Sequence, residues 1–486
     1  MKQFATILIG LVVGLFLLSA TAQTQETTSP KRPGPQLLRA EEDWGLWGER
    51  QDPQPQLPFD GLKYIAFGED VYLTLGGQFR LAHELFINER YGEVDQDDSG
   101  SLLLRMMPHI NLRIGPNFRV FTEFKSTHES GRDEGPTPVD VDRLDVHQLF
   151  TEVSIADPRQ THNPNLLLRL GRQELFYGEG RLVDVRDGPP VRRTFDVGLL
   201  RFDAPAVRID ALFALEVPVQ PGVFDNGSEE EGTTRPRLWG SYAKTQPFPL
   251  GGGFGLGFDL YYLGVDQDRL VFVEGSGQER RHSAGGRWWL ESRTFRHELE
   301  GTVQWGELED PETGRSSTIN AWGVAASASY TFADHQTRPS VKLSGGAQSG
   351  DTTPGDGKLG TYRAPFPNLR WAGATTGVGP GNGFGGNLSV GFHPLTQLHL
   401  LAIARVFFRL SLDDAPYSPA GFPLRVAPES DKRHVGSSVA LNVNWLVHTH
   451  ITAYVRGEIF EPGGYLEDAP PAQTTGFLTV GSDVKF

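Results

Sequence analysis

Residues 71–84, VYLTLGGQFRLAHE, alternate between apolar and polar side chains. A period of two places successive side chains on opposite faces, which is the pattern of a β-strand with one apolar face. The apolar set is Val71, Leu73, Leu75, Phe79 and Leu81, and the polar set is Tyr72, Thr74, Gln78, Arg80 and Glu84. This stretch therefore predicts an amphipathic strand.

The same alternation recurs along the rest of the chain in about 18 segments. Residues 104–114 and 398–409 repeat it clearly, because Arg, His or Asn side chains oppose an aliphatic face. The predicted strands lie near 70–85, 101–115, 117–129, 142–156, 166–173, 192–203, 206–216, 235–247, 252–265, 279–292, 295–308, 318–332, 338–349, 384–395, 397–410, 433–446, 448–460 and 474–486. The fold class is therefore all-β.

The lengths of the connections separate a membrane barrel from a soluble sandwich. Short turns such as 115–117 alternate with long segments such as 86–100, 174–191, 266–278 and 350–383. Outer-membrane barrels have short periplasmic turns and long extracellular loops, and a barrel of about 18 strands encloses an aqueous channel. We therefore predict a closed antiparallel transmembrane β-barrel over residues 70–486.

The composition excludes several other classes of protein. Hydrophobic residues are 38% and the mean hydropathy is −0.33, and no apolar run long enough for a transmembrane helix follows the N-terminus. The chain has 0 Cys, which excludes disulfide frameworks, thiolate catalysis and Cys-ligated metals. A formal charge of −15 argues against a nucleic-acid partner.

The N-terminus carries an export signal. Lys2 precedes an apolar run over 7–18, and Ala20-Thr21-Ala22 is typical of a cleavage site. We predict a signal peptide over 1–22, cleavage near Ala22, and an irregular, proline-rich periplasmic extension over 23–69. The expected location of the barrel is the outer membrane of a Gram-negative type of cell.

If the apolar faces meet lipid, the alternate charged side chains face the lumen. Among the side chains assigned to the lumen bases outnumber acids, whereas the whole chain has 45 Lys and Arg against 60 Asp and Glu. Arginine binds carboxylates bidentately, so these residues are candidates for an anion path. The alternative is that Arg and Glu pair across strands simply to fill a polar lumen. The lumen candidates from the strand pattern are Arg80, Arg105, Arg208, Arg405 and Arg456.

One local motif resembles a known family. Residues 170–182 read LGRQELFYGEGRL, and residues 192–196 read RRTFD. This pair resembles the alginate export family of outer-membrane proteins, and the likeness in layout covers about residues 70–486. The resemblance implies a monomeric barrel with an arginine-rich pore for an anionic uronate polymer. On that implication the best pore residues are Arg169, Arg172, Arg192 and Arg193.

Catalytic and metal-binding motifs are weak. Asp95 and Asp97 match the opening of a calcium loop, but its twelfth position is Met106 rather than Glu, so an acidic surface loop is the better interpretation. No spacing of a nucleophile and a base stands out. We therefore predict no enzymatic activity, no cofactor and no resident metal.

These observations converge on a transport function. The leading hypothesis is passive, selective passage of an anionic polysaccharide or oligouronide through an arginine-lined lumen. The alternative is a general or small-organic-anion porin. The expected partners are outer-membrane lipid and lipopolysaccharide, the anionic carbohydrate itself, and a periplasmic secretion partner, with no nucleic acid.

Overall fold

A computed structural model describes residues 33–48, 57–68, 70–156, 164–227, 235–367, 373–375, 377–427 and 429–486. The predicted signal peptide, 1–22, lies outside the described residues. The chain forms two compact units, Met1–Gln54 and Pro55–Phe486. In the first unit, the described part contains η1 (Arg39–Glu41) and α2 (Gly45–Gly48), with an ion pair of 2.7 Å between Arg39 and Glu42.

The second unit is a closed antiparallel barrel of 18 strands, as the sequence predicts. Its strands are β2 (Val71–Ile87), β3 (Ser101–Ile114), β4 (Phe118–Ser130), β5 (Asp142–Ser154), β6 (Asn165–Gln173), β7 (Phe195–Asp203), β8 (Val207–Glu216), β9 (Arg237–Thr245), β11 (Phe254–Val271), β12 (Ser276–Glu291), β13 (Phe295–Glu309), β14 (Ser316–Thr331), β15 (Ser340–Gln348), β17 (Gly383–Leu395), β18 (Leu398–Phe408), β19 (His434–His448), β20 (Ile451–Pro462) and β21 (Thr475–Lys485). Shorter elements are η2 (Asp60–Leu62), β1 (Ile65–Ala66), α3 (Glu89–Gly92), β10 (Phe248–Gly251), β16 (Lys358–Leu359) and α4 (Gly464–Glu467).

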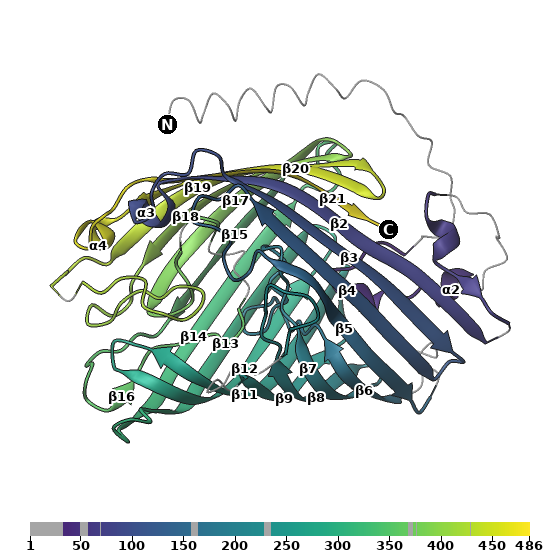
Figure 1. The fold of residues 1–486 in the computed structure, drawn as a ribbon, viewed down its shortest axis with the longest axis horizontal. Coiled ribbons are helices and arrows are strands. Elements are labelled where there is room, and N and C mark those ends of the chain that lie inside the picture. Colours follow the sequence, from purple (N-terminus) through teal and green to yellow (C-terminus); the bar gives the residue numbers. More distant parts are fainter. Residues whose placement is uncertain are drawn as a thin grey trace. The chain divides into compact units, whose positions relative to one another are not determined.

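The first and last barrel strands close the sheet. β2 pairs with β3 on one side and with β21 on the other, in a register from Gln78 opposite Lys485 to Ile87 opposite Gly476. Figure 1 shows β2 and β21 side by side at this seam. Closure satisfies the backbone groups that an open sheet edge would leave unpaired in hydrocarbon.

The alternation of side chains separates the two faces of the barrel wall. Leu260, Leu343 and Val303 are 66%, 62% and 57% exposed on the outer face. Arg105 and Glu123 are 1% exposed on the inner face. Large apolar side chains therefore surround the barrel and charged side chains fill it, which is the reverse of a soluble protein.

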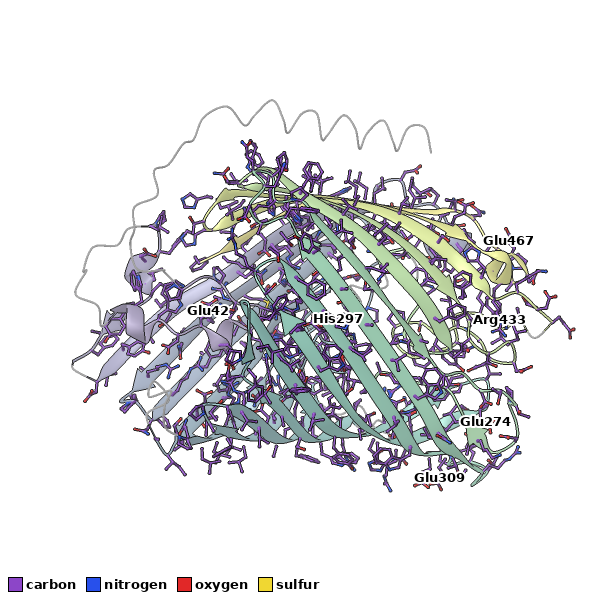
Figure 2. The ribbon with its side chains drawn as sticks, turned by 180° about the vertical axis from the view of Figure 1, so that it is seen from behind. Glu42, Glu274, His297, Glu309, Arg433 and Glu467 are labelled. Atoms are coloured by element: carbon purple, nitrogen blue, oxygen red, sulfur yellow. The ribbon has the colours of Figure 1, made fainter. Side chains whose placement is uncertain are left out.

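The connections define two ends of the barrel. The short-turn end includes turns 115–117, 204–206, 292–294 and 449–450, and the long-loop end includes 88–100, 174–194, 349–382 and 409–433. In outer-membrane barrels long loops are extracellular. Figure 2 labels His297 near the short-turn end of β13 and Glu309 at its long-loop end.

One predicted long loop is wrong. The segment 266–278 is mostly strand, because β11 continues to Val271 and β12 begins at Ser276. Gln278 Nε2 on β12 donates a hydrogen bond to Asp266 Oδ1 on β11 across this extended hairpin (2.8 Å). The polar composition of the segment reflects strands that project beyond the lipid, not an irregular loop.

Residues 57–68 pack against the inner face of β2 near the short-turn end. Lys63 is fully buried, its Nζ donates to the carbonyl of Leu75 (3.0 Å), and its carbonyl accepts from Thr74 Oγ1 (2.9 Å). The ring of Phe59 lies 4.8 Å from that of Phe486. This segment thus ties the start of the barrel to its C-terminus.

The lipid-facing assignment predicts unequal effects of arginine at adjacent positions. Leu388 is 47% exposed on the outer face of β17, whereas its neighbour Asn387 lines the interior. Leu388→Arg should destabilise the barrel by about 2–4 kcal/mol, and Asn387→Arg by less than about 1 kcal/mol, because only the former places charge in hydrocarbon. Denaturant titrations in lipid vesicles measure both, and equal losses would contradict the assignment.

Among the described residues, no helix combines the length and the apolar character that a membrane-spanning helix requires.

Candidate functional site

Residues 174–194, here named the strap, fold from the long-loop end into the barrel. Two groups of ion pairs anchor the strap to the barrel wall. At the first anchor, Asp187 contacts Arg80 of β2 and Arg105 of β3. At the second anchor, Glu179 contacts Arg287 of β12 and Arg296 of β13, at 2.9 Å in each case. The strap connects β6 with β7, and these contacts attach it to two other parts of the wall, β2–β3 and β12–β13. The strap therefore divides the lumen.

Asp187 is the hub of the first anchor. Its carboxylate lies 3.0 Å from Arg80 Nη2, 2.7 Å from Arg105 Nη2 and 3.4 Å from Arg192 Nη1. Burial opposes ionisation of this carboxyl, but Arg105, Arg80 and Arg192 outweigh it and hold the pKa of Asp187 well below its ordinary value. The three arginines are thus bound to a permanent negative charge.

An apolar cluster stiffens the strap from within. Val183 of the strap forms a parallel bridge with Phe366, a residue of the 349–382 loop. Phe366 N donates to Leu182 O (2.9 Å), and Asp184 N donates to Phe366 O (2.8 Å). The cluster also contains Phe195 and Tyr242 from the barrel wall. Apolar packing of this kind holds the two inward loops as one body.

Eight of the arginines that the sequence singles out are engaged in ion pairs. Arg80, Arg105 and Arg192 contact Asp187. Arg456 is exposed, and its guanidinium carbon lies 4.4 Å from the centre of the Tyr454 ring. The remaining pairs and their N–O distances are Arg169–Glu152 (2.6 Å), Arg172–Asp196 (2.9 Å), Arg192–Glu174 (2.7 Å), Arg193–Glu216 (2.9 Å), Arg208–Asp203 (2.6 Å) and Arg405–Glu458 (2.9 Å). Pairing of this kind fills a polar lumen, and the role of these arginines in the substrate path stays a prediction.

The structure brings only some of these candidates together. Arg80, Arg105 and Arg192 meet at Asp187, whereas Arg208 lies beside a short turn with its side chain 46% exposed. Arg405, on β18, lines an open space inside the barrel.

The weak calcium candidate is an ordinary turn. Asp97 accepts hydrogen bonds from Ser99 N (2.8 Å) and Gly100 N (2.9 Å), and these backbone bonds lower its pKa. Asp95 is exposed. In the described ranges, Glu123, His147 and Glu174 do bring possible metal-ligating atoms within 4.8 Å of one another. Glu174 Oε1 there also accepts from His147 Nε2 at 2.9 Å and pairs with Arg192.

A cavity of about 320 Å³, which we name the corridor, runs along the inner face of β14, β15 and β17. On β15 it extends from Lys342 to Gln348, a length of about 20 Å at 3.3 Å per residue. The corridor is open because the inward positions of three adjacent strands carry small or short polar residues. They are Gly323, Ala325 and Ser327 on β14, Ser344 and Gly346 on β15, and Gly385, Asn387 and Ser389 on β17.

The charges around the corridor are balanced. Its lining includes the bases Arg181, Lys342 and Arg405 and the acids Glu179, Glu298 and Glu300. Arg181 pairs with both Glu298 and Glu300. Sequence reasoning missed the corridor, although its signal is present in SVKLSGGAQ (340–348) and GFGGNLS (383–389), where most inward positions carry a small or short polar side chain.

An apolar-belted closed barrel with a polar corridor inside it defines an outer-membrane channel. The family described as Alginate export matches residues 71–478, and the chain belongs to this family. No curated protein matches the sequence.

Solved structures share the fold at low identity. OccAB1 of Acinetobacter baumannii is 12% identical with a TM-score of 0.56, over 88% of this chain and 99% of that one. OccAB2 of the same organism is 10% identical with a TM-score of 0.55, over 85% and 98%. OprD of Pseudomonas aeruginosa, an outer membrane protein, is 9% identical with a TM-score of 0.51, over 85% and 94%.

Proposed function

We propose that this channel passes acidic oligosaccharides, such as oligouronides, by passive diffusion along the corridor. The observation that carries the proposal is the lining. Hydroxyl and amide groups of Ser327, Ser344, Asn387 and Ser389 line the corridor, and so do the cations Arg181, Lys342 and Arg405. Such groups replace the hydrogen bonds that sugar hydroxyls and carboxylates make with water. Membership of the alginate export family supports the same class of substrate.

The size of the corridor favours short chains, and it is also compatible with a second function, a porin for small organic anions. A volume of about 320 Å³ lies at the lower end of the range for small-molecule sites. A porin for small organic anions fits the same volume. The two functions differ in whether successive sugar units contribute to binding.

Current block distinguishes them. In planar bilayers, an oligouronate of four units should interrupt the current for roughly tenfold longer than its monomer, because each added contact lengthens residence and 1.4 kcal/mol corresponds to a factor of ten. A neutral oligosaccharide of equal length is the control and should interrupt it only briefly. Equal residence of tetramer and monomer would favour the small-anion porin, and no block by either would overturn the proposal.

A further inference from the structure

Three inward-facing cations near the short-turn end stand apart from the paired arginines. Arg113 is the penultimate residue of β3, Lys244 the penultimate residue of β9, and Lys342 the third residue of β15. In the part of the chain that the structure describes, none of the three side chains has a carboxylate within ion-pair distance. Lys244 and Lys342 are exposed and Arg113 is half-buried.

The strand register places all three on the inner face. Arg113 is opposite Tyr72, which is buried inside the barrel, and Lys244 is opposite Asp259, which is 1% exposed. Lys342 lines the corridor. These side chains therefore point into the short-turn mouth and not into lipid.

Nearby acids do not neutralise them, because those acids are already bound. Asp259 Oδ2 lies 2.7 Å from Arg287 Nη2 and accepts from the Tyr242 hydroxyl (2.7 Å). Glu152, two strands from Arg113, is held by Arg119 and Arg169. Glu298, on the other wall of the corridor, is held by Arg181.

The three cations are also spread around the barrel. β3, β9 and β15 are the second, eighth and thirteenth of the barrel strands in the order of the sheet, which is close to one-third of the circumference apart. Charged side chains arranged as a ring select ions of opposite sign in other pores. Fixed charge at the mouth of a low-dielectric cleft also raises the local concentration of an oppositely charged solute.

We propose that Arg113, Lys244 and Lys342 form a ring of positive charge that captures carboxylate-bearing chains at the short-turn mouth. This inference rests on the proposed function and adds to it a capture site and a side. The corridor begins at Lys342, so a chain that the ring captures enters the corridor at its short-turn end. Arg181, Arg192 and Arg193 of the strap, being paired, hold the loop in place, whereas the ring supplies the attraction.

The test is the rate of current block by oligouronate added to one side at a time. The triple variant Arg113→Gln, Lys244→Gln, Lys342→Gln should lower the blocking on-rate from the short-turn side roughly tenfold at low salt, in line with electrostatic steering, and leave the on-rate from the long-loop side unchanged. Raising the salt should remove the difference from wild type, since exposed charges are then screened.

The control is a matched triple variant at the long-loop end, Arg315→Gln, Lys358→Gln, Lys432→Gln, which should leave the short-turn on-rate unchanged. Because the chain has 0 Cys, Glu312→Cys in the turn between β13 and β14 gives a unique thiol that reports orientation in the bilayer. An impermeant thiol reagent then identifies the long-loop side.

The outcomes separate the ring from the function itself. If wild type is not blocked from either side, the proposed function fails. If wild type is blocked but the short-turn triple variant keeps its on-rate, the ring is overturned and the function stands. If the triple variant does not fold, Lys244→Gln and Lys342→Gln are measured singly, and each should lower the short-turn on-rate by part of the tenfold effect. An unchanged on-rate in both single variants overturns the ring.

Discussion

Asp187→Ala should raise the single-channel conductance severalfold and increase the current noise. The substitution leaves Arg80, Arg105 and Arg192 around a vacated charge, and like charges then repel at the anchor of the strap. Removing one partner of a buried ion pair costs about 3–5 kcal/mol when the other partner remains buried and uncompensated. Arg105 would be left in that position, whereas Arg80 keeps Asp483 and Arg192 keeps Glu174. The strap should therefore leave this anchor, and its departure opens the part of the lumen that it fills.

The control for this result is a carboxylate outside the barrel wall. Asp356 lies in the exposed part of the 349–382 loop and pairs with the exposed Lys358 at 3.5 Å, so Asp356→Ala should leave the conductance unchanged. Planar-bilayer recordings at two salt concentrations measure both variants. A wild-type conductance in Asp187→Ala would show that the strap stays in place without this anchor, held by the apolar cluster and the contacts of Glu179.

Ser344→Trp should lower the conductance severalfold. Ser344 faces the corridor from β15, and an indole adds a large rigid group to a space of about 320 Å³. The matched control is Leu343→Trp, since Leu343 is the adjacent residue and is 62% exposed on the lipid face. That variant should conduct as wild type does. If Ser344→Trp also conducts normally, the current does not pass along the corridor.

The strand pattern was predictable because it is local. Whether a residue such as Leu343 meets lipid or a residue such as Ser344 meets water follows from the alternation itself. Boundaries were less predictable where a strand meets an inward loop. The segment 192–203 was predicted as one strand, yet β7 begins at Phe195, because Arg192 and Arg193 belong to the strap and pair with Glu174 and Glu216.

The candidate site was predictable only in part. The sequence marks Arg105 as inward-facing, and the structure places it there with 1% exposure. The alternation in the sequence carries no information on the ion-pair partner of Arg105, which is Asp187, a residue 82 positions away in a long loop. The arginines thus have a structural explanation that alternation along a strand does not contain.

By itself, the sequence determined the closed barrel, its apolar belt and which side chains face the lumen, because each depends on the period of two within a strand. Only the tertiary structure decided which inward charges are neutralised and where open space remains. Both depend on where loops of 20 or more residues fold, and that is fixed by contacts between distant segments such as Val183 with Phe366 and Asp187 with Arg105. The open path consequently runs along β14, β15 and β17, beside small residues, and of the motif's arginines Arg181 lines it.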